Sequence, residues 1–346
     1  MKKLSLLAIA LCAASYSFAQ ETESSPLEIS GSIDAYYKYD FEKTSGNIPT
    51  SFATDHNSVS LGMIDVALKK TTGKASFVGE LSFGPRGQSQ SILPQDGTPE
   101  SFHIQNLYAS YAFTEQFSMT AGFMGTFIGY EIISPVGNFN YSTSYLFTNG
   151  PFQNAGIKAN YTFSDKVGVM VGLFNDTWNT YIADPSFGVN AFGAQVSLAP
   201  VDGWNAYLNV LTGSNCGTIL DLTTAYQITD KFKLGLNAAD WSGINDDEGY
   251  TGVALYPSYA ITDGFALGLR GEYFKAKESA TALFGPAADE SVTAVTLSAN
   301  LKHGGLTFIP EIRFDNSSSD MFFKEGSAVQ NTKSASQFSL GLVYAF

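Results

Sequence analysis

Charged side chains recur at every second position in segments that are otherwise apolar or small. Arg270 and Glu272 are separated by one glycine, and Glu311 and Arg313 by one isoleucine. Successive side chains of a β-strand point to opposite faces, so each pair would share one face. If that face lines water, charges of both signs would set an electric field across it. The alternative is a set of solvated wall residues with no special role. The candidates for this face are Asp34, Lys38, Lys158, Arg270, Glu272, Glu311 and Arg313.

The sequence offers little for covalent or metal-dependent catalysis. Its three histidines, His56, His103 and His303, lie far apart, and no group of cysteines and histidines has the spacing of metal ligands. It contains no phosphate-binding loop ending in Gly-Lys-Ser/Thr and no Gly-x-Ser-x-Gly nucleophile turn. We therefore predict no catalytic residues, no metal and no cofactor.

The first nineteen residues have the pattern of a secretory signal peptide. Lys2 and Lys3 precede an apolar stretch over 4–14, and Ala19 ends a motif suited to cleavage. Removing 1–19 would change the formal charge from −13 to −15, because two lysines and no acids are lost. Such an acidic chain argues against nucleic-acid partners. We expect 20–346 to form one domain without a disulfide, since Cys216 is the only cysteine left in it.

Beyond the signal, no apolar run approaches the roughly 20 residues that a membrane helix needs. A chain that spans a membrane would then have to use strands, and both ends of the mature chain alternate as strands do. Over 27–41 the odd positions are apolar or small and the even positions are almost all polar. The last ten residues repeat the pattern, with Tyr344 and Phe346 on the apolar face. This ending resembles the signal read by the barrel-assembly machinery of Gram-negative outer membranes; a soluble sandwich that ends in Phe is the alternative.

Four hairpins share the pattern Tyr-x-[Phe/Ile]-[Ser/Thr]-[Asp/Glu]-x-apolar. Ser, Thr and Asp favour tight turns because they bond to nearby backbone, and the first and third residues of the pattern share a face. These side chains would ring a barrel at the height of its short turns, where an interfacial aromatic girdle belongs. The four copies are 111–117, 161–167, 226–232 and 259–265.

Short and long connections alternate along the chain, as in outer-membrane barrels. Seven short turns and eight longer polar gaps predict about sixteen antiparallel strands in up-and-down order, with both termini on the short-turn side. Besides the four hairpins, the short turns are 71–73, 200–203 and 303–305. The long gaps are 42–56, 85–100, 131–153, 177–186, 212–217, 242–249, 276–290 and 316–334.

Three positions disturb the strand pattern. Pro257 and Pro310 fall inside predicted strands. Because a closed barrel has no free edge, each proline must mark a bulge or a lost ladder hydrogen bond. The strand over 57–69 changes its apolar face between Leu61 and Ile64, which predicts a bulge near Gly62.

The predicted inward positions are too small and too polar to pack a dry core. Burying them without partners would cost several kcal/mol each, whereas barrels of about sixteen strands leave an aqueous channel. The sequence therefore predicts an all-β transmembrane antiparallel barrel that encloses water. The acidic total charge favours a mild preference for cations. Examples of these inward positions are Ser30, Ser32, Asn205, Asn209, Ser298 and Asn300.

The segment 131–153 is the most distinctive of the long connections. It follows Gly129-Tyr130-Glu131 and carries Asn-Phe-Asn-Tyr-Ser over 138–142. At these residues the chain resembles the OmpL-like β-barrel porin family of Bacteroidetes and other Gram-negative bacteria, whose members carry similar stretches. The aromatic run 36–41 and Gly-Leu-Phe-Asn at 172–175 also look like family positions. The resemblance spans essentially the whole mature chain.

The resemblance implies an outer-membrane porin for passive diffusion of small hydrophilic solutes. Its partners would be the lipid bilayer and the barrel-assembly machinery, with a homotrimer as a candidate assembly. In trimeric porins the third loop often folds into the barrel and narrows it, which makes 131–153 a candidate constriction by analogy. Alternatively, its residues pack the loop against the wall or a neighbouring subunit. The constriction candidates are Tyr130, Glu131, Asn138, Asn140 and Ser142.

Two other functions stay open at this point. The first is an adhesin or assembly scaffold that acts through the long loops 85–100 and 316–334. The second is an outer-membrane hydrolase, which would need a catalytic site near the lipid face. His103, near the outer end of its predicted strand, is the single candidate for such a site.

Overall fold

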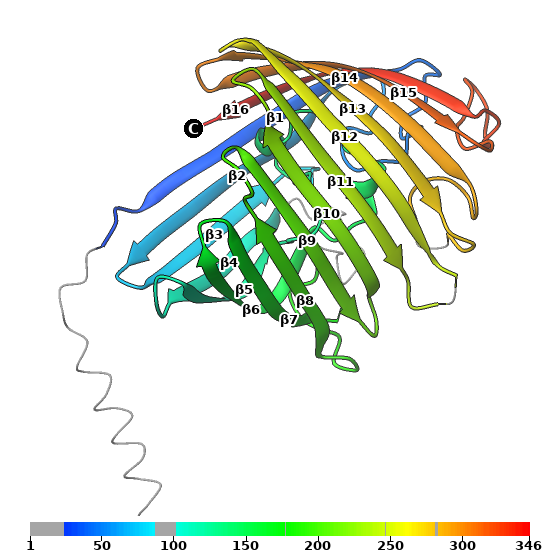
Figure 1. Cartoon of the computed structure of the whole chain (residues 1–346). Coiled ribbons are helices and arrows are strands. Elements are labelled where there is room, and N and C mark those ends of the chain that lie inside the picture. Colours follow the sequence, from blue (N-terminus) through cyan, green and yellow to red (C-terminus); the bar gives the residue numbers. More distant parts are fainter. Residues whose placement is uncertain (1–23, 87–101, 177, 246, 281–282) are drawn as a thin grey trace, which may run out of the picture.

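Sixteen antiparallel strands close into one barrel in the computed structural model of the chain (Figure 1). The structure describes residues 24–86, 102–176, 178–245, 247–280 and 283–346, so the predicted signal peptide 1–19 lies outside the described residues. Each strand pairs with its neighbours in sequence, and β1 pairs with β16 to close the wall. The predicted all-β, up-and-down barrel is confirmed.

The strands are nine to fifteen residues long, as tilted membrane strands require. In chain order they are β1 (Glu28–Asp40), β2 (Ser58–Thr72), β3 (Ala75–Phe83), β4 (Phe102–Ala112), β5 (Phe117–Gly125), β6 (Gln153–Ser164), β7 (Val167–Asn175), β8 (Val189–Leu198), β9 (Trp204–Gly213), β10 (Gly217–Gln227), β11 (Phe232–Ser242), β12 (Gly249–Thr262), β13 (Phe265–Ala276), β14 (Ser291–His303), β15 (Leu306–Ser317) and β16 (Ser334–Ala345).

The connections alternate in length as predicted, with two differences. The connection between β9 and β10 covers only 214–216, so the predicted long gap at 212–217 is a tight turn. The third loop runs over 126–152 and begins five residues before the predicted 131, because β5 already ends at Gly125. β1 begins and β16 ends at the short-turn end of the barrel (Figure 1).

The two strand prolines cost ladder pairs without shifting the register. Pro257 pairs with Leu234 of β11, but the ladder to β13 lacks partners for Tyr256 and Pro257. Pro310 pairs with Leu340 of β16, while the ladder to β14 is interrupted beside it. Of the two predicted options, a bulge or a lost ladder hydrogen bond, both prolines show the lost hydrogen bond. The predicted bulge near Gly62 is confirmed, because the β1–β2 register shifts between Ile33 and Ala35, opposite that glycine.

The outward face of the barrel is apolar and carries aromatic side chains near the short turns. Tyr111 packs against Phe113, and Tyr161 against Phe163, at ring-centroid distances of 4.9 Å. All four rings are exposed, as an interfacial girdle in contact with lipid would be. Val59 and Leu61 of β2 are even more exposed on this face. Within the described residues, no helix is long and apolar enough to cross a bilayer.

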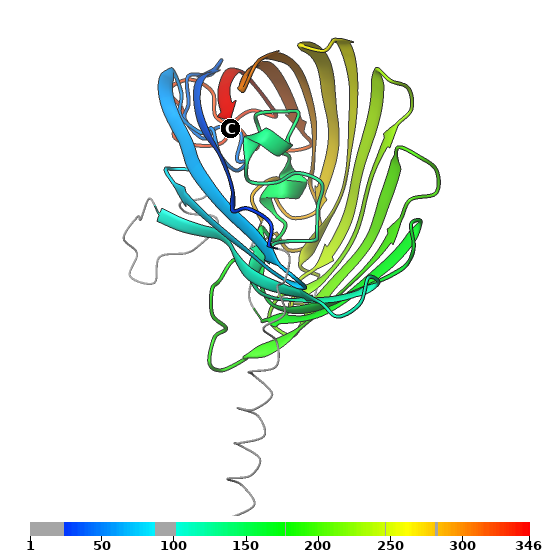
Figure 2. The same cartoon turned by 90° about the vertical axis from the view of Figure 1, so that its left-hand side faces the viewer.

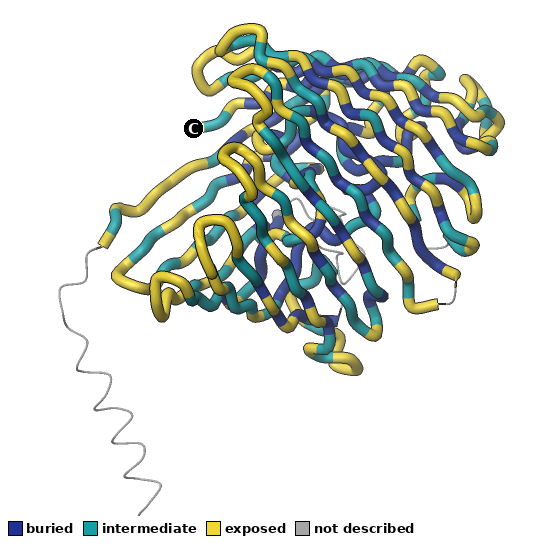
Figure 3. The backbone as a smooth tube through the Cα atoms, viewed as in Figure 1, coloured by how far each residue is buried: buried dark blue, intermediate teal, exposed yellow. Residues whose placement is uncertain are grey.

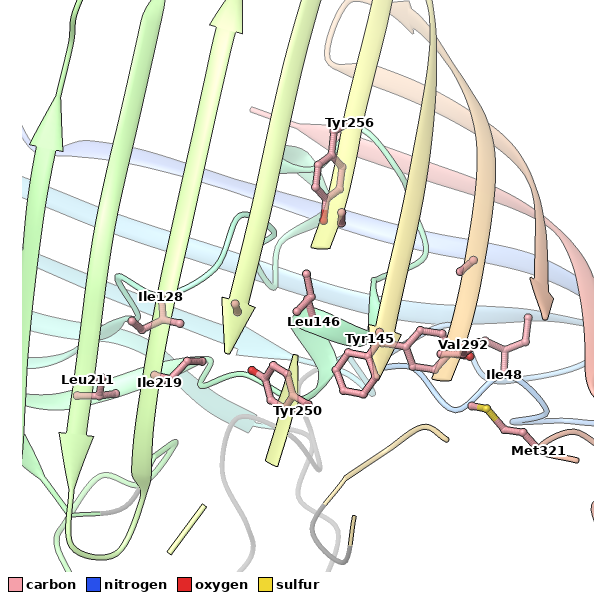
Figure 4. Packing of buried hydrophobic residues seen from close by; sticks show 14 of the residues in the cluster. Ile48, Ile128, Tyr145, Leu146, Leu211, Ile219, Tyr250, Tyr256, Val292 and Met321 are labelled. Atoms are coloured by element: carbon pink, nitrogen blue, oxygen red, sulfur yellow. The ribbon is translucent and has the colours of Figure 1, made fainter. Parts of the chain in front are cut away.

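The interior differs between the two ends of the barrel. Towards the long loops, inward side chains such as Phe174, Leu211 and Phe274 are fully buried (Figure 3). They form an apolar cluster with loop residues, among them Ile48 and Leu146. Figure 4 shows Leu146 and Tyr145 of the third loop next to wall residues such as Tyr250. Towards the short turns, inward residues such as Asn205 and Lys233 are exposed.

Candidate pore constriction

The third loop lies inside the barrel, where Figure 2 shows its two short helical turns surrounded by strands. These turns are η1 (Pro135–Gly137) and α2 (Tyr145–Thr148). We call residues 132–138 the tip and residues 139–146 the anchored leg. The two parts belong to one loop but meet their surroundings in different ways.

Arg270 of β13 makes the largest set of contacts with the loop. Its guanidinium forms a fully buried ion pair with Glu131 at 2.8 Å. It also donates to the main-chain oxygens of Ser142, at 2.5 Å, and Thr143, at 3.2 Å. The second carboxylate oxygen of Glu131 accepts from the main chain and the hydroxyl of Ser144, both at 2.7 Å. Arg270 therefore joins the start of the loop, the anchored leg and the wall.

Two wall carboxylates hold main-chain N–H groups of the anchored leg. Glu311 of β15 accepts from Tyr141 at 3.0 Å and from Ser142 at 3.3 Å. Glu272 of β13 accepts from Tyr145 at 3.0 Å and from Leu146 at 2.9 Å. These four donors would otherwise be buried without partners, at a cost of about 1–3 kcal/mol each. The carboxylates therefore fix the path of the backbone itself.

Arg313 and Asp315 of β15 hold the start of α2. Their side chains form a buried ion pair at 2.7 Å, and Arg313 donates to the Thr143 oxygen at 2.8 Å. The Tyr145 hydroxyl donates to Asp315 at 2.7 Å. Burial raises the pKa of this hydroxyl well above its ordinary value.

Asp34 of β1 holds the middle of the leg with help from a second loop. It accepts from the Tyr141 hydroxyl at 2.5 Å and forms a buried ion pair with Arg86 at 3.3 Å. The Arg86 guanidinium lies between the rings of Phe52 and Tyr141, 4.6 and 4.8 Å from their centroids. Stacking of this kind is available to arginine and suits a buried site. Burial also raises the pKa of the Tyr141 hydroxyl well above its usual range.

The start of the loop crosses to the opposite wall. The Gly129 N–H donates to Asp221 of β10 at 3.1 Å. Tyr130 stacks on Tyr256 of β12, with ring centroids 4.4 Å apart. The Tyr130 ring lies so close to Gly235 of β11 that a Cβ at this glycine would collide with it. The loop thus touches β10–β12 before Glu131 turns towards β13.

The tip makes fewer bonds to its surroundings: Arg86 donates to the Ile133 oxygen at 3.4 Å, and the buried Ile133 side chain packs in a cluster with Met63 of β2. The Asn138 side chain accepts from the Ile132 N–H at 3.0 Å and donates to the Ile132 oxygen at 2.6 Å. On one side of the tip lies a cavity of about 600 Å³ that opens towards the short turns, and we call it the vestibule. On the other side, against β3–β6, lies a smaller cavity of about 190 Å³.

The five constriction candidates are spread along the loop: two precede the tip, one belongs to the tip, and two belong to the anchored leg. Tyr130, Asn138 and Asn140 border the vestibule, as does part of Glu131. Asn140 donates to Ser298 of β14 at 2.7 Å. Ser142 is buried against Arg270 and Glu311. Most of these polar groups therefore bind the barrel wall. This agrees with the second option from the sequence, in which these residues pack the loop against the wall.

The charge candidates are all on the inner side of the wall, but only one of them lacks a polar contact. Among the residues that the structure describes, no hydrogen bond or ion pair involves the side chain of the half-buried Lys158. Lys38 is buried and donates to the Thr54 oxygen at 3.3 Å. Asp34, Arg270, Glu272, Glu311 and Arg313 contact the third loop as described above.

The remaining sequence candidates lie away from this site. Tyr344 and Phe346 are exposed on the outward face, and Phe346 exchanges main-chain hydrogen bonds of 3.0 and 3.1 Å with Gly31. His103 is buried in the wall. Where the structure describes the chain, no group of three or more His, Cys, Asp or Glu side chains could hold a metal ion.

Sequence reasoning missed several residues that hold the loop. Asp315 continues the alternation of Glu311 and Arg313, so the same pattern could have found it. Arg86 follows β3 in a connection, where side chains do not alternate as they do along a strand, and no other local signal marks it. Tyr141 lies inside the family-like stretch 138–142, but its partner Asp34 is 107 positions away in sequence.

Solved structures of other outer-membrane barrels share this fold at low sequence identity. OmpF of Salmonella typhi in complex with daunomycin aligns with a TM-score of 0.63, 12% identity, and coverage of 92% of this chain and 97% of that chain. The trimer form of OmpT, an outer membrane protein of Vibrio cholerae, aligns with a TM-score of 0.58 and 12% identity, and covers 93% of this chain and 99% of that chain. A mutant porin of Rh. blastica aligns with a TM-score of 0.57 and 14% identity, and covers 93% of this chain and 100% of that chain. At this identity the likeness shows the fold alone.

No curated protein matches the sequence. The family described as "Putative beta-barrel porin-2, OmpL-like" matches residues 26–346, which is nearly the whole chain. The resemblance predicted from the aromatic and Asn-rich stretches is confirmed. The chain, a porin-like barrel whose third loop lies in its lumen, therefore belongs to this OmpL-like family of β-barrel porins.

Proposed function

We propose that the protein is an outer-membrane porin through which small hydrophilic solutes diffuse passively, with the third loop as its constriction. The main support is the position of that loop: it crosses a sixteen-strand barrel and still leaves a 600 Å³ vestibule beneath it. Barrels of this strand number enclose enough space for water. The protein has no enzymatic role in this proposal, and the burial of His103 does not favour a hydrolase at the lipid face.

Liposome swelling tests the passage of solutes directly. Vesicles that contain the refolded protein should swell in isotonic arabinose or glucose, whereas vesicles without it should not. Absence of swelling with a correctly folded barrel would refute the porin function and favour the adhesin or scaffold.

Single-channel recording tests the constriction. Deleting 134–147 removes most of the tip and all of the anchored leg, so conductance should rise severalfold. A matched deletion of 324–330, in the exposed β15–β16 loop, should leave conductance unchanged. Equal conductance of the 134–147 deletion and the intact protein would remove the loop from this role.

A mild preference for cations also belongs to this proposal. Seven carboxylates and four basic groups lie around the loop, which leaves a formal excess of three negative charges. They are Asp34, Asp40, Glu131, Asp221, Glu272, Glu311 and Asp315, against Lys38, Arg86, Arg270 and Arg313. Opposite charges at 2.7–3.3 Å cancel most of each other's field, so a small excess should give weak selectivity. Reversal potentials in a salt gradient measure it, and clear anion preference would contradict it.

Three further elements of the proposal concern the life of the protein in the cell. Residues 1–19 act as a cleaved signal peptide, Tyr344 and Phe346 are read by the barrel-assembly machinery, and the porin forms a homotrimer. N-terminal sequencing of the outer-membrane form should begin at Gln20. Cross-linking in native membranes should give a band of three chains, and a double substitution of the two aromatics should reduce the assembled amount.

A further inference from the structure

The tip places two aliphatic side chains in the water of the lumen. Ile132 is 50% exposed and Val136 is 51% exposed, although both belong to a loop enclosed by the barrel. Polar side chains of the same loop, such as Glu131 and Ser142, are buried against the wall. The usual distribution of polar and apolar groups is thus reversed within this loop, and an apolar edge in water is a place where the apolar part of a solute gains by contact.

These two side chains border both cavities of the lumen. Val136 lines the 600 Å³ vestibule, together with Pro135 and Gly137. Ile132 lines the 190 Å³ cavity against β3–β6. A solute that moves past the tip on either side therefore meets an aliphatic surface.

Both cavities have polar groups in a lining that is otherwise largely apolar. The vestibule is faced by Lys233 of β11 and by Asn300 and Lys302 of β14. The smaller cavity is faced by Glu80 of β3 and Asn106 of β4, whose side chains are hydrogen-bonded to each other at 2.5 Å. Each space thus has an aliphatic edge at the tip and, elsewhere in its lining, polar groups that can bind the polar side of a solute.

The tip holds this apolar edge in a fixed position. The two hydrogen bonds between Asn138 and Ile132 close the turn at its base. Within the turn, the Ile132 side chain lies over Gly137, where any Cβ would collide with it. Pro135, which is buried, begins η1 and fixes one backbone angle there. The exposure of Ile132 and Val136 is therefore a property of the turn.

We propose that the tip determines specificity, and that it favours amphiphilic solutes, with one apolar and one polar side, over fully polar solutes of equal size and charge. This inference rests on the proposed porin function. An apolar face that slides along Ile132 and Val136 removes hydrocarbon surface from water, while the polar side stays hydrated or bonds to the opposite wall. A fully polar solute can make the same bonds with the wall, but on the side of the tip it loses water and gains no hydrogen bond in exchange.

The test compares two zwitterionic amino acids of nearly equal mass, leucine and asparagine, in liposome swelling. The intact protein should admit leucine faster than asparagine. The double variant Ile132→Thr, Val136→Thr keeps the branched shape but replaces methyl or ethyl groups with hydroxyls. It should lower the leucine-to-asparagine ratio by about fourfold, the change expected when contact with one buried methyl group is lost. Val59→Thr is the matched control, because Val59 is 82% exposed on the lipid face.

A second variant gives the opposite expectation. Val136→Leu adds apolar surface towards the vestibule, so it should raise the ratio. A ratio that stays constant in both variants, while arabinose still enters, would overturn the specificity role and leave the porin function intact. If the intact protein admits no solute at all, arabinose included, both proposals fail together.

Discussion

The anchored leg and the tip of the third loop adjoin in sequence yet follow opposite rules. The leg, residues 139–146, is buried, and its main chain is bonded to Arg270, Glu272, Glu311 and Arg313. The tip, residues 132–138, is closed by its own Asn138 and exposes Ile132 and Val136. The comparison teaches that lumenal charges can serve to hold a loop, and that the surface offered to a solute can then be aliphatic.

This division has an energetic reason. A buried charge is expensive unless it is paired and hydrogen-bonded. The leg meets this demand because its free N–H and C=O groups supply the partners that the wall charges need. The exposed side of the tip lies where water reaches it, so the tip needs fewer such partners: Arg86 donates to the Ile133 oxygen, and Asn138 closes the turn.

Substitution of Arg270 should have the largest effect on the contrast between the two parts. Arg270→Ala leaves Glu131 buried without a cation and removes the donors to Ser142 and Thr143. Breaking a buried pair in this way costs about 3–5 kcal/mol. We expect a lower free energy of unfolding in urea and noisier, larger single-channel conductance, because the leg detaches. Arg270→Lys should restore only part of the unfolding free energy and of the normal conductance, since one ammonium cannot replace the guanidinium fork. Unchanged conductance in a folded Arg270→Ala barrel would contradict the role of the leg.

Loss of a single hydroxyl should give an intermediate effect. Tyr145→Phe removes the 2.7 Å bond to Asp315 but leaves the ion pair of Asp315 with Arg313. The expected destabilisation is about 1.5–3 kcal/mol, the range for a hydrogen bond to a charged group. The loss of the folded band on unboiled gels with rising temperature would report it. A matched Tyr207→Phe, in a half-exposed wall position, should leave that temperature unchanged.

Substitution in the tip should have the smallest effect on stability. Val136→Thr changes a half-exposed side chain that no wall residue holds, so the unfolding free energy should change by less than about 0.5 kcal/mol. Urea titrations of this variant and of Arg270→Ala, measured side by side, give the contrast directly. A cost above 2 kcal/mol for Val136→Thr would mean that the tip is anchored as firmly as the leg.

Much of the wall was predictable because period-two alternation is a local property. A few neighbouring residues decide each of the features that were predicted correctly. These are the inward direction of Arg270 and Glu272, the bulge at Gly62 and the short turns. Alternation also identified which charges point inward. It says nothing, however, about what lies across the lumen at the same height.

The contacts of the loop could not be predicted for that reason. Tyr141 and Glu311 are 170 positions apart, and Arg86 reaches Asp34 from a connection without any period. Polar side chains in the loop suggested a polar constriction, but polarity alone does not tell whether a group faces water or a buried charge. Asn138 illustrates the difficulty, since its amide is used within the tip itself.

The seam between β1 and β16 has a consequence for the order of folding. Its pairs, from Ser32 with Ala345 to Asp40 with Gln337, join the first and last strands of the wall. Such long-range pairing is slow, because the chain must lose loop entropy before the contacts compensate for it. Until the seam forms, both strands present unpaired edges on which other chains can add. The nascent barrel is thus most vulnerable to aggregation just before closure, and a chaperone that covers those two edges would be of most use at that moment.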